Sequence, residues 1–441
     1  MDFSGLLVQL LNGLAGASTL FLVAAGLSLI FGVLRVVNFA HGSLYMLGLY
    51  GAYTCVEQLG GVLGFWPALL LAPLAVGLLG AAVEVLLLRR IYRAPELLQL
   101  LATFALVLVI KDAALWLWGP EELFGPRAPG LEGAVDLLGR RFPAYDLFLI
   151  AVGPLVLVLL TLLLTRTRWG TLVRAATQDR EMVGALGVNQ AWLFTSVFAL
   201  GALLAGLGGA LQLPREPASL ELDMLTIGAA FVVVVVGGMG SLPGAFVAAL
   251  VIAELKAVCI WLGVVEVAGV EVAFPRLTLV VEFLVMAGVL IWRPWGLMGR
   301  PQAVARGVGA PEAPLRQAGQ GATAAWCALV LALALLPLAV EPGSYATVLL
   351  TDIAIAALFA ASLHCILGPG GLHSFGHAAY FGLGAYGAAL LVRWLDWPMG
   401  TALLLGPLVA AAGALVYGWF CVRLSGVSLT MLTLAFAQIT W

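Results

Sequence analysis

Residues 38–52 read NFAHGSLYMLGLYGA, and residues 374–388 read SFGHAAYFGLGAYGA. The longer stretch 24–52 aligns without gaps on 360–388, and the matches include a histidine, a tyrosine and several glycines. Self-similarity at a constant offset indicates a duplicated structural unit. The chain is therefore predicted to contain two homologous units, the first built around His41 and the second around His377.

A second, weaker match follows in the same order. YRAPELLQLLATFALV at 92–107 resembles VRLSGVSLTMLTLAFA at 422–437, which pairs Thr103 with Thr433. Apolar runs long enough to cross a bilayer recur along the whole chain. Only 10% of the residues are charged, against about 25% in soluble domains. The expected fold class is therefore an all-α polytopic membrane protein with two homologous transmembrane units.

The apolar runs predict the membrane spans and their grouping. We expect spans in the first unit at about 6–34, 38–57, 62–90, 98–118, 146–165, 192–212, 225–237, 243–263 and 275–292. We expect further spans at about 322–340, 347–367, 372–392 and 398–421, with a last helix from 428. The run 225–237 is short for a full span and favours a re-entrant or broken element. Residues 299–321, rich in Pro, Gly, Ala and Gln, read as a linker between unit 1–298 and unit 322–441.

Arginines indicate the orientation. Basic clusters at 89–93, 166–180 and 293–316 fall between predicted spans, and the positive-inside rule places them in the cytoplasm. The N-terminus is then outside and the linker 299–321 cytoplasmic, so 6–34 and 347–367 cross in the same direction. Parallel repeats imply a pseudo-twofold axis along the membrane normal, with a pathway between the halves. Trp441 falls inside an apolar helix, so the second unit is expected to be incomplete.

Several classes of protein are disfavoured. Lys111 and Lys256 are the only lysines and neither follows a glycine, so the chain has no phosphate-binding loop of the GxxxxGK[ST] type. No HExxH, GxSxG or paired-acid motif appears, which argues against catalytic residues and an enzyme. The cysteines are scattered, so neither a disulfide framework nor a metal site is expected. We expect no cofactor and no nucleic-acid partner.

The repeated stretch supplies the first set of candidate residues for a solute pathway. Unpaired polar groups are costly in hydrocarbon, so these side chains should face protein or a cavity. The glycines among them would let helix backbones approach closely. The two histidines either pack at the seam between the halves or contact a passing solute, and the sequence leaves both readings open. The candidates are Asn38, His41, Gly42, Ser43 and Tyr45, with Ser374, His377 and Tyr380 in the second unit.

The stretch VVVVVGGMGSLPGAFVAALV at 232–251 supplies the second set. Its glycines and proline interrupt an apolar run, and the backbone groups freed by such a break either line a cavity or find partners in a tight hairpin. Both readings remain open for Gly237, Gly238, Gly240 and Ser241. Six ionisable residues in or near spans are also candidates, although charged side chains near span ends can snorkel to the interface. They are Glu84, Lys111, Asp112, Glu254, Lys256 and Glu282.

A third stretch, TRWGTLVRAATQDREMVGALGVNQAW at 167–192, is long, polar and charged. Apolar residues at Val173, Ala176, Val183, Leu186 and Val188 make it partly amphipathic. It is either an ordinary charged loop or a short helical segment that docks into another subunit.

Three of these stretches carry a resemblance to a known family. GLSLIFGVLRVVNFAHGSLYMLGLYGAY, RWGTLVRAATQDREMVGALGVN and VVGGMGSLPGAFVAALVI together resemble the H-type permease of ABC importers for branched-chain amino acids, the Liv family, over about 1–298. CILGPGGLHSFGHAAYFGLGAYGAALL followed by VRLSGVSLTMLTLAFAQI is similar to the start of the M-type permease, over about 345–441. The chain thus resembles an H-type permease fused to the N-terminal part of an M-type permease.

The resemblance implies a function and a set of partners. It implies a multi-pass permease of the bacterial inner plasma membrane that works with two cytosolic ABC ATPase subunits and a periplasmic or lipid-anchored solute-binding protein. The segment 167–190 matches the family's coupling region, which would assign Arg174, Ala175, Asp179 and Gly187 to the contact with an ATPase. Branched-chain amino acids are the favoured substrates; urea, short amides and other amino acids are alternatives within the family. An ATP-independent secondary transporter is a more distant alternative, and its inverted repeats would contrast with the parallel repeat here.

Overall fold

The computed structural model describes residues 3–92, 94–137, 139–267, 270–299, 319–339, 343–422, 424 and 426–440. The chain forms two compact units, Met1–Arg300 and Pro301–Trp441, and we describe each by itself. Most of the predicted linker 299–321 lies outside the described residues, as do Arg93, Arg300, Arg306, Arg316, Arg423 and Trp441.

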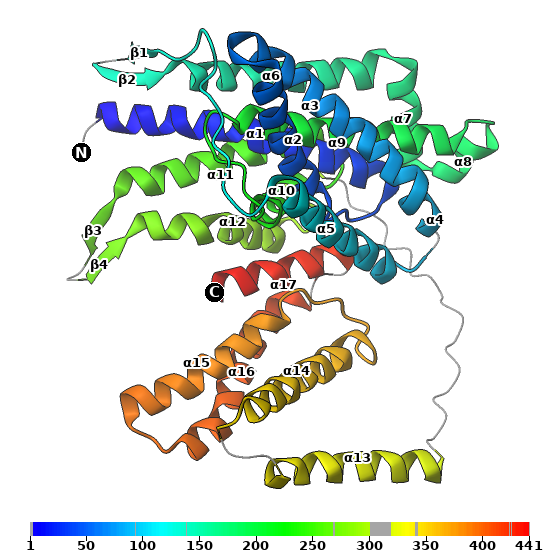
Figure 1. The fold of residues 1–441 in the computed structure, drawn as a ribbon, viewed down its shortest axis with the longest axis vertical. Coiled ribbons are helices and arrows are strands. Elements are labelled where there is room, and N and C mark those ends of the chain that lie inside the picture. The colour runs from blue at the N-terminus through cyan, green and yellow to red at the C-terminus, as the bar shows by residue number, and fades with distance from the viewer. Residues whose placement is uncertain are drawn as a thin grey trace. The chain divides into compact units, whose positions relative to one another are not determined.

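Both units are built from α-helices (Figure 1). Unit 1 contains α1 (Phe3–Leu34), α2 (His41–Leu59), α3 (Gly61–Val83), a π-helical segment η1 (Glu84–Leu88), α4 (Arg89–Ile91), α5 (Glu96–Trp118), α6 (Ala144–Arg166), α7 (Arg168–Gln178), α8 (Arg180–Ala185), α9 (Gln190–Gln212), α10 (Leu222–Gly237), α11 (Leu242–Leu262), a 3-10 turn η2 (Phe274–Leu277) and α12 (Thr278–Trp292). Unit 2 contains α13 (Gln320–Ala339), α14 (Tyr345–Leu367), α15 (His377–Leu395), α16 (Met399–Cys421) and α17 (Gly426–Thr440).

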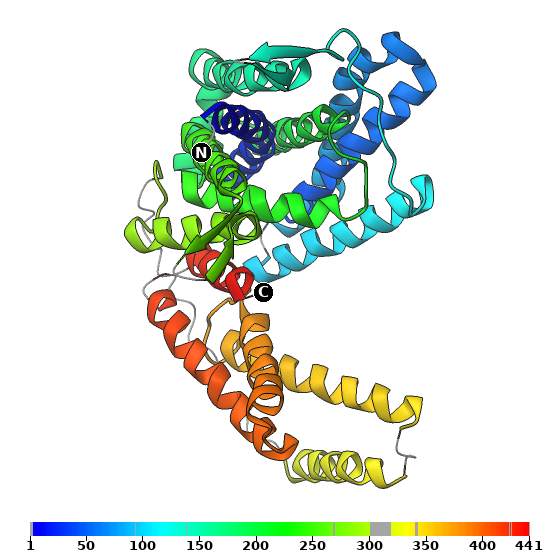
Figure 2. The ribbon, with the colours of Figure 1, turned by 90° about the vertical axis from the view of Figure 1, so that its left-hand side faces the viewer.

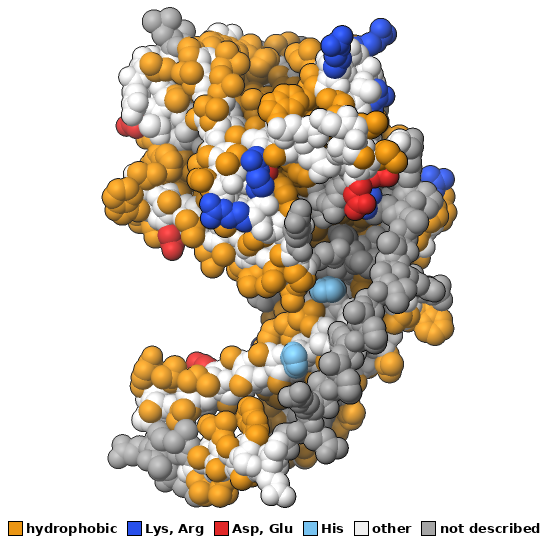
Figure 3. All heavy atoms as spheres, turned by 90° about the vertical axis from the view of Figure 1, so that its right-hand side faces the viewer, with side chains coloured by type: hydrophobic (Ala, Val, Ile, Leu, Met, Phe, Trp, Pro, Cys, Tyr) orange, Lys and Arg blue, Asp and Glu red, His pale blue; other side chains and the backbone are white. Residues whose placement is uncertain are grey.

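The helices confirm the all-α membrane fold. Among the described residues, 10 helices are long and apolar enough to span a bilayer. Two short antiparallel hairpins, which the sequence did not indicate, join helices in unit 1: β1 (Ala134–Leu137) with β2 (Arg140–Pro143), and β3 (Val264–Val267) with β4 (Val270–Ala273). Apolar side chains cover much of the face drawn in Figure 3, with charged groups in small clusters, as expected of a surface that meets lipid.

Helix α1 is the centre of unit 1. It is apolar on all sides, and a helix of that kind is usually buried. In its most apolar stretch, 89% of the residues are buried, because α6, α9, α10 and α11 pack around it (Figures 1 and 2). Glycine permits the closest of these contacts: a Cβ on Gly26 would lie 2.5 Å from the carbonyl oxygen of Gly201 on α9.

Helix α9 lies against α2 with almost no side chain between the two backbones. A Cβ on Gly48 of α2 would lie 2.3 Å from the carbonyl oxygen of Gly206, and one on Gly209 would lie 2.0 Å from the carbonyl oxygen of Tyr45. Lipid is as apolar as the side chains of a helix, so apolar burial alone contributes little to helix association in a membrane. Close approach of the backbones through small residues favours association instead. The glycines of the repeated stretch thus position α2 against α9.

The two copies of the repeated stretch form equivalent helices. Helices α2 and α15 begin at His41 and His377 and each contains 19 residues. Both start later than the predicted spans 38–57 and 372–392, because the residues before each histidine are not helical.

The second, weaker match also has a structural counterpart. The Thr103 hydroxyl donates to the Val37 carbonyl oxygen (3.4 Å), and the Thr433 hydroxyl accepts from the Phe375 amide (3.0 Å). In each unit, therefore, an equivalent threonine contacts the non-helical segment that precedes the histidine.

Candidate functional site

A pocket of unit 1 lies between α1, α2, α9, α10 and α11. Its volume is about 720 Å³, within the range of about 300–1,000 Å³ that is common for small-molecule sites. Gly13, Gly16, Leu20, Val23, Leu222, Leu225, Ala229, Ala253, Ala257 and Ile260 form its apolar wall. Its polar wall contains Gln9, Asn12, Thr19, Tyr45, Gln212, Arg215, Glu216, Thr226 and Lys256.

Charges of both signs face this pocket. The Arg215 guanidinium pairs with Asp146 at 3.2 Å, and the Lys256 ammonium pairs with Glu282. The two carboxylate partners do not line the pocket, whereas Glu216 does. Arg215 and Glu216 are exposed in the turn after α9, and Lys256 is half-buried on α11. This end of the pocket therefore presents groups of both signs to a solute that carries a positive and a negative group.

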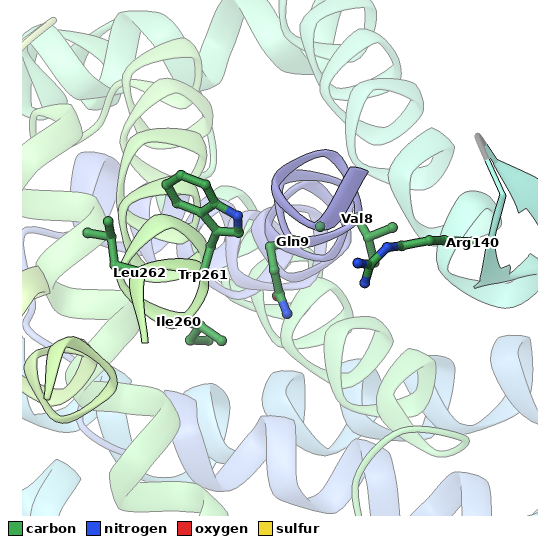
Figure 4. A pocket seen from close by; sticks show the side chains of 7 residues that line it. Val8, Gln9, Arg140, Ile260, Trp261 and Leu262 are labelled. Atoms are coloured by element: carbon green, nitrogen blue, oxygen red, sulfur yellow. The ribbon is translucent and has the colours of Figure 1, made fainter. Parts of the chain in front are cut away.

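A second pocket, of about 470 Å³, shares Gln9 and Ile260 with the first. It lies where the first turns of α1 meet the end of α11 and strand β2 (Figure 4). Trp261 and Leu262 stand on one side of α1 and Arg140 on the other (Figure 4). The shared residues make the two pockets neighbours, and their linings together extend from the first turns of α1 to Tyr45.

Tyr45 is the residue of the first predicted set that lines the first pocket, with 4% of its surface exposed. The neighbouring polar residues of the set are buried away from it. Asn38 accepts a hydrogen bond from the Ala40 amide at 3.1 Å, Ser43 is fully buried, and Gly42 packs against the carbonyl oxygen of Asp223 at the start of α10. They hold the start of α2 in place and are not exposed to a solute in this structure.

His41 is fully buried and packs between helices. Its Nε2 lies 3.0 Å from the Val23 carbonyl oxygen of α1, to which it donates a hydrogen bond. Gly26 leaves room for the ring, since a Cβ there would lie 3.0 Å from the His41 Cε1 atom. The geometry favours packing over contact with a solute.

Replacing His41 with Ala is expected to lower stability without changing the apparent affinity for the solute. Truncating a large buried side chain costs about 2–5 kcal/mol, through the lost contacts and the cavity left behind. Thermal unfolding in detergent and the KM of uptake measure the two effects, and His364→Ala, at an exposed position of α14, is the control. An increased KM at unchanged stability would instead indicate that His41 contacts the solute.

The second predicted set forms a tight turn between α10 and α11. Gly238 and Gly240 adopt φ values of 102° and 83°, which favour glycine, and Ser241 caps α11 by accepting from the Gly244 amide at 3.2 Å. The carbonyl groups freed at Val236 and Gly237 accept hydrogen bonds from the amides of Leu297 and Met298. These backbone groups therefore find protein partners, and α10 itself is an unbroken helix of 16 residues.

In unit 2, the candidate residues lie close together around the start of α15. The His377 Nε2 is 2.7 Å from the Ser362 hydroxyl, and the rings of His377 and Tyr380 have centroids 6.1 Å apart. Ser374 accepts from the Gly376 amide at 3.3 Å. Ser362 occupies the position equivalent to Gly26, so the two histidines have different partners on equivalent helices.

The third stretch forms two short helices, α7 and α8, between α6 and α9. Val173 and Ala176 are buried and Ala175 is half-buried, whereas Arg174, Asp179 and Gly187 are exposed. Asp179 caps α8 by accepting from the Met182 amide at 3.0 Å, and Gly187 ends the segment with a φ of 84°. The stretch is thus helical, with its charged residues available to a partner.

One residue of the predicted amphipathic face lies on the other side. Leu186 is 76% exposed, and Met182 beside it is 58% exposed, whereas Val183 is buried. The helix break at Asp179 changes the register, which a single helical period across the stretch did not anticipate. Met182 and Leu186 thus form an exposed apolar patch on a segment that also exposes Arg174 and Asp179.

The sequence indicated Lys256 and Glu282 but did not indicate Arg215, Glu216 or Gln212. Gln212 is the last residue of α9, and Arg215 and Glu216 follow the helix, where charged side chains usually indicate a loop. An Arg–Glu pair that begins three residues after a glutamine, at the end of an apolar span, is the signal that could have identified them.

The bundle of apolar helices, the pocket with charged lining residues and the exposed helical pair α7–α8 together define a multi-pass membrane transport protein. The family described as "Branched-chain amino acid transport system / permease component" matches residues 9–290, and the chain belongs to it. No solved structure matches this chain significantly.

Curated relatives agree with this family. The permease protein BraD of the high-affinity branched-chain amino acid transport system of Pseudomonas aeruginosa is 30% identical over 306 residues, which cover 67% of this chain and 96% of BraD. The corresponding permease proteins LivH of Escherichia coli K12 and Salmonella typhimurium LT2 are each 26% identical, over 68% of this chain and 98% of the relative. The chain is therefore a transport permease, and the matches cover about two thirds of it.

Proposed function

We propose that this protein is the translocation subunit of an ATP-driven importer for branched-chain amino acids. The observation that carries the proposal is the 720 Å³ pocket, in which an apolar wall faces Arg215, Glu216 and Lys256. The cationic side chains of Arg215 and Lys256 suit the carboxylate of an amino acid, and the Glu216 carboxylate suits its ammonium group. The apolar wall suits its aliphatic side chain. The relatives named for this transport support the same substrate.

Under this proposal, the solute enters from outside the cell. The N-terminal end of α1, where the two pockets begin, faces outward, and a periplasmic or lipid-anchored binding protein delivers the amino acid there. The helices α7 and α8 lie in the cytoplasm, in agreement with the arginines at 166–180. Two ABC ATPase subunits bind on that side, and ATP binding shifts the permease between its two access states.

We further propose that 322–441 is an M-type permease unit and that 299–321 is a cytoplasmic linker. The equal length of α2 and α15 and the equivalent contacts of Thr103 and Thr433 support a common origin of the two units. In this arrangement, the two units cross the membrane in the same direction, and the pathway candidates of both belong to one permease pair.

Uptake into proteoliposomes tests the proposed function. The complex of this chain with its ATPase and solute-binding partners should accumulate labelled leucine when ATP is supplied, and a catalytically inactive ATPase should abolish accumulation. Unlabelled valine and isoleucine should compete, whereas urea, acetamide and phenylalanine should not. Competition by urea or acetamide alone would move the substrate to small amides, and uptake that follows an ion gradient without ATP would contradict the importer assignment.

A further inference from the structure

A buried carboxylate that lines neither of the two pockets is the centre of a polar cluster in unit 1. Glu84 is fully buried in the π-helical segment that continues α3. Its Oε2 accepts from Arg89 Nη2 (2.9 Å) and from the Thr195 hydroxyl (2.7 Å), and its Oε1 accepts from the Tyr92 hydroxyl (3.0 Å). Charge-assisted hydrogen bonds are among the stronger ones, so the cluster holds α3 firmly against the first turns of α9.

The remaining contacts of the cluster reinforce the same junction. Arg89 also donates to the Ala191 carbonyl oxygen at 3.4 Å, and the ring of Tyr92 packs edge-on against Phe194 with centroids 5.8 Å apart. Burial raises the pKa of the Tyr92 phenol, with a further contribution from the Glu84 charge, so Tyr92 stays protonated and donates. Three residues of the first turns of α9 are thereby tied to the end of α3.

The same turns of α9 also contact α7 and α8, the two short helices of the stretch 167–192. The indole Nε1 of Trp169, the second residue of α7, donates to the Ser196 hydroxyl at 2.8 Å, next to Thr195. Gly184 of α8 lies directly against the Gln190 side chain, since a Cβ there would be 2.2 Å from its Nε2. A continuous set of contacts therefore runs from α7 and α8, through the start of α9, to Glu84.

Further along, α9 remains in close contact with α3 and reaches the first pocket through Gln212. A Cβ on Gly80 of α3 would lie 2.4 Å from the Cβ of Ala202, and Gly209 of α9 lies against the backbone of Tyr45. A movement of the start of α9 would therefore carry α3 and the Tyr45 wall with it. Contiguous packing and hydrogen bonds of this kind can carry coupling between distant sites.

We propose that Glu84, with Arg89, Tyr92 and Thr195, is a positioning clamp that makes α3 and α9 respond as one body to movement of α7 and α8. The inference rests on the proposed function, because it assigns the route by which ATPase motion reaches the pocket. The π-helical segment supports it, since such segments are uncommon and frequently lie at functional sites. The clamp positions helices and does not contact the solute.

The test measures leucine transported per ATP hydrolysed by the complete complex in proteoliposomes. Thr195→Val removes the hydroxyl at nearly constant shape, and Glu84→Gln removes the charge. Both are expected to lower the ratio by about tenfold, within the usual range of allosteric coupling, while ATP hydrolysis continues. Thr195→Ser keeps the hydroxyl and should restore the ratio, and Glu57→Gln, which removes an exposed carboxylate of α2, is the matched control.

The outcomes separate the clamp from a structural role and from the proposed function. A clamp predicts loss of the ratio in correctly folded Thr195→Val, so the test stands even if Glu84→Gln fails to fold. If uptake and hydrolysis fall together in proportion to folded protein, or if Thr195→Val matches the wild type, the clamp is overturned. If the wild-type complex hydrolyses ATP and moves no leucine, the proposed substrate or function fails, and the clamp falls with it.

Discussion

Replacing Gly48 with Val is expected to prevent unit 1 from folding into a stable bundle. The first atom of the new side chain would lie 2.3 Å from the Gly206 carbonyl oxygen and 2.5 Å from its Cα, and both are backbone atoms that do not rotate away. Overpacking commonly costs about 1–3 kcal/mol, and the two further methyl groups of valine put this site at or above the upper end. The gain from replacing a helical glycine, under about 1 kcal/mol, is smaller.

The yield of monodisperse protein and the midpoint of thermal unfolding in detergent measure this effect. Gly228→Val is the matched control, because Gly228 also lies within a helix, α10, but has no atoms within 4 Å of its added Cβ. The control should fold as the wild type does. Equal stability of the two variants would show that α2 and α9 do not approach as closely as described.

Replacing Met182 and Leu186 together with Asp is expected to abolish binding of the ATPase subunits. Their exposed fractions are 58% and 76%; Met182 lies in α8, next to Glu181, and Leu186 directly follows the helix. Burying one such side chain contributes about 1.5–3 kcal/mol, so losing two from an interface lowers affinity by about 100-fold or more. The inserted carboxylates add a desolvation cost.

Co-purification of the ATPase with the tagged permease measures this loss. Phe124→Asp, at an exposed apolar side chain in the loop between α5 and α6, is the control and should leave binding intact. Asp179→Asn separates two roles of Asp179: asparagine preserves the cap of α8, so any loss of binding or transport reports on the charge. Full ATPase recovery with the Met182 and Leu186 variant would place the docking surface elsewhere.

Local pattern was sufficient for much of this protein. The apolar runs predicted the helices of both units, and the repeat predicted equivalent elements around His41 and His377. Tyr45 and Lys256, two residues selected from the sequence, do line the pocket. The predictions of the helices and of the repeated elements succeed because hydropathy and duplication are properties of the chain itself, read one segment at a time.

The same local pattern did not distinguish a polar residue that lines a path from one that packs. His41 and Tyr45 stand four positions apart in one motif, yet the first donates to Val23 of α1 and the second faces the pocket. Arg215 and Glu216 do lie in a turn after a span, but the tertiary packing brings this turn beside α1 and α11, where both residues line the pocket. Glu84 looked like one of several charges near a span end, and it proved to be the fully buried centre of a cluster.

The sequence by itself determined the class of protein, the helices, the duplication and the family. The tertiary structure decided which polar groups line a pocket, which hold helices together and which are exposed. The reason is physical: helix formation in a membrane depends on each segment's own hydropathy and backbone hydrogen bonds. The surroundings of a side chain depend instead on α9, α10 and α11, which reach α1 and α2 from more than a hundred residues away.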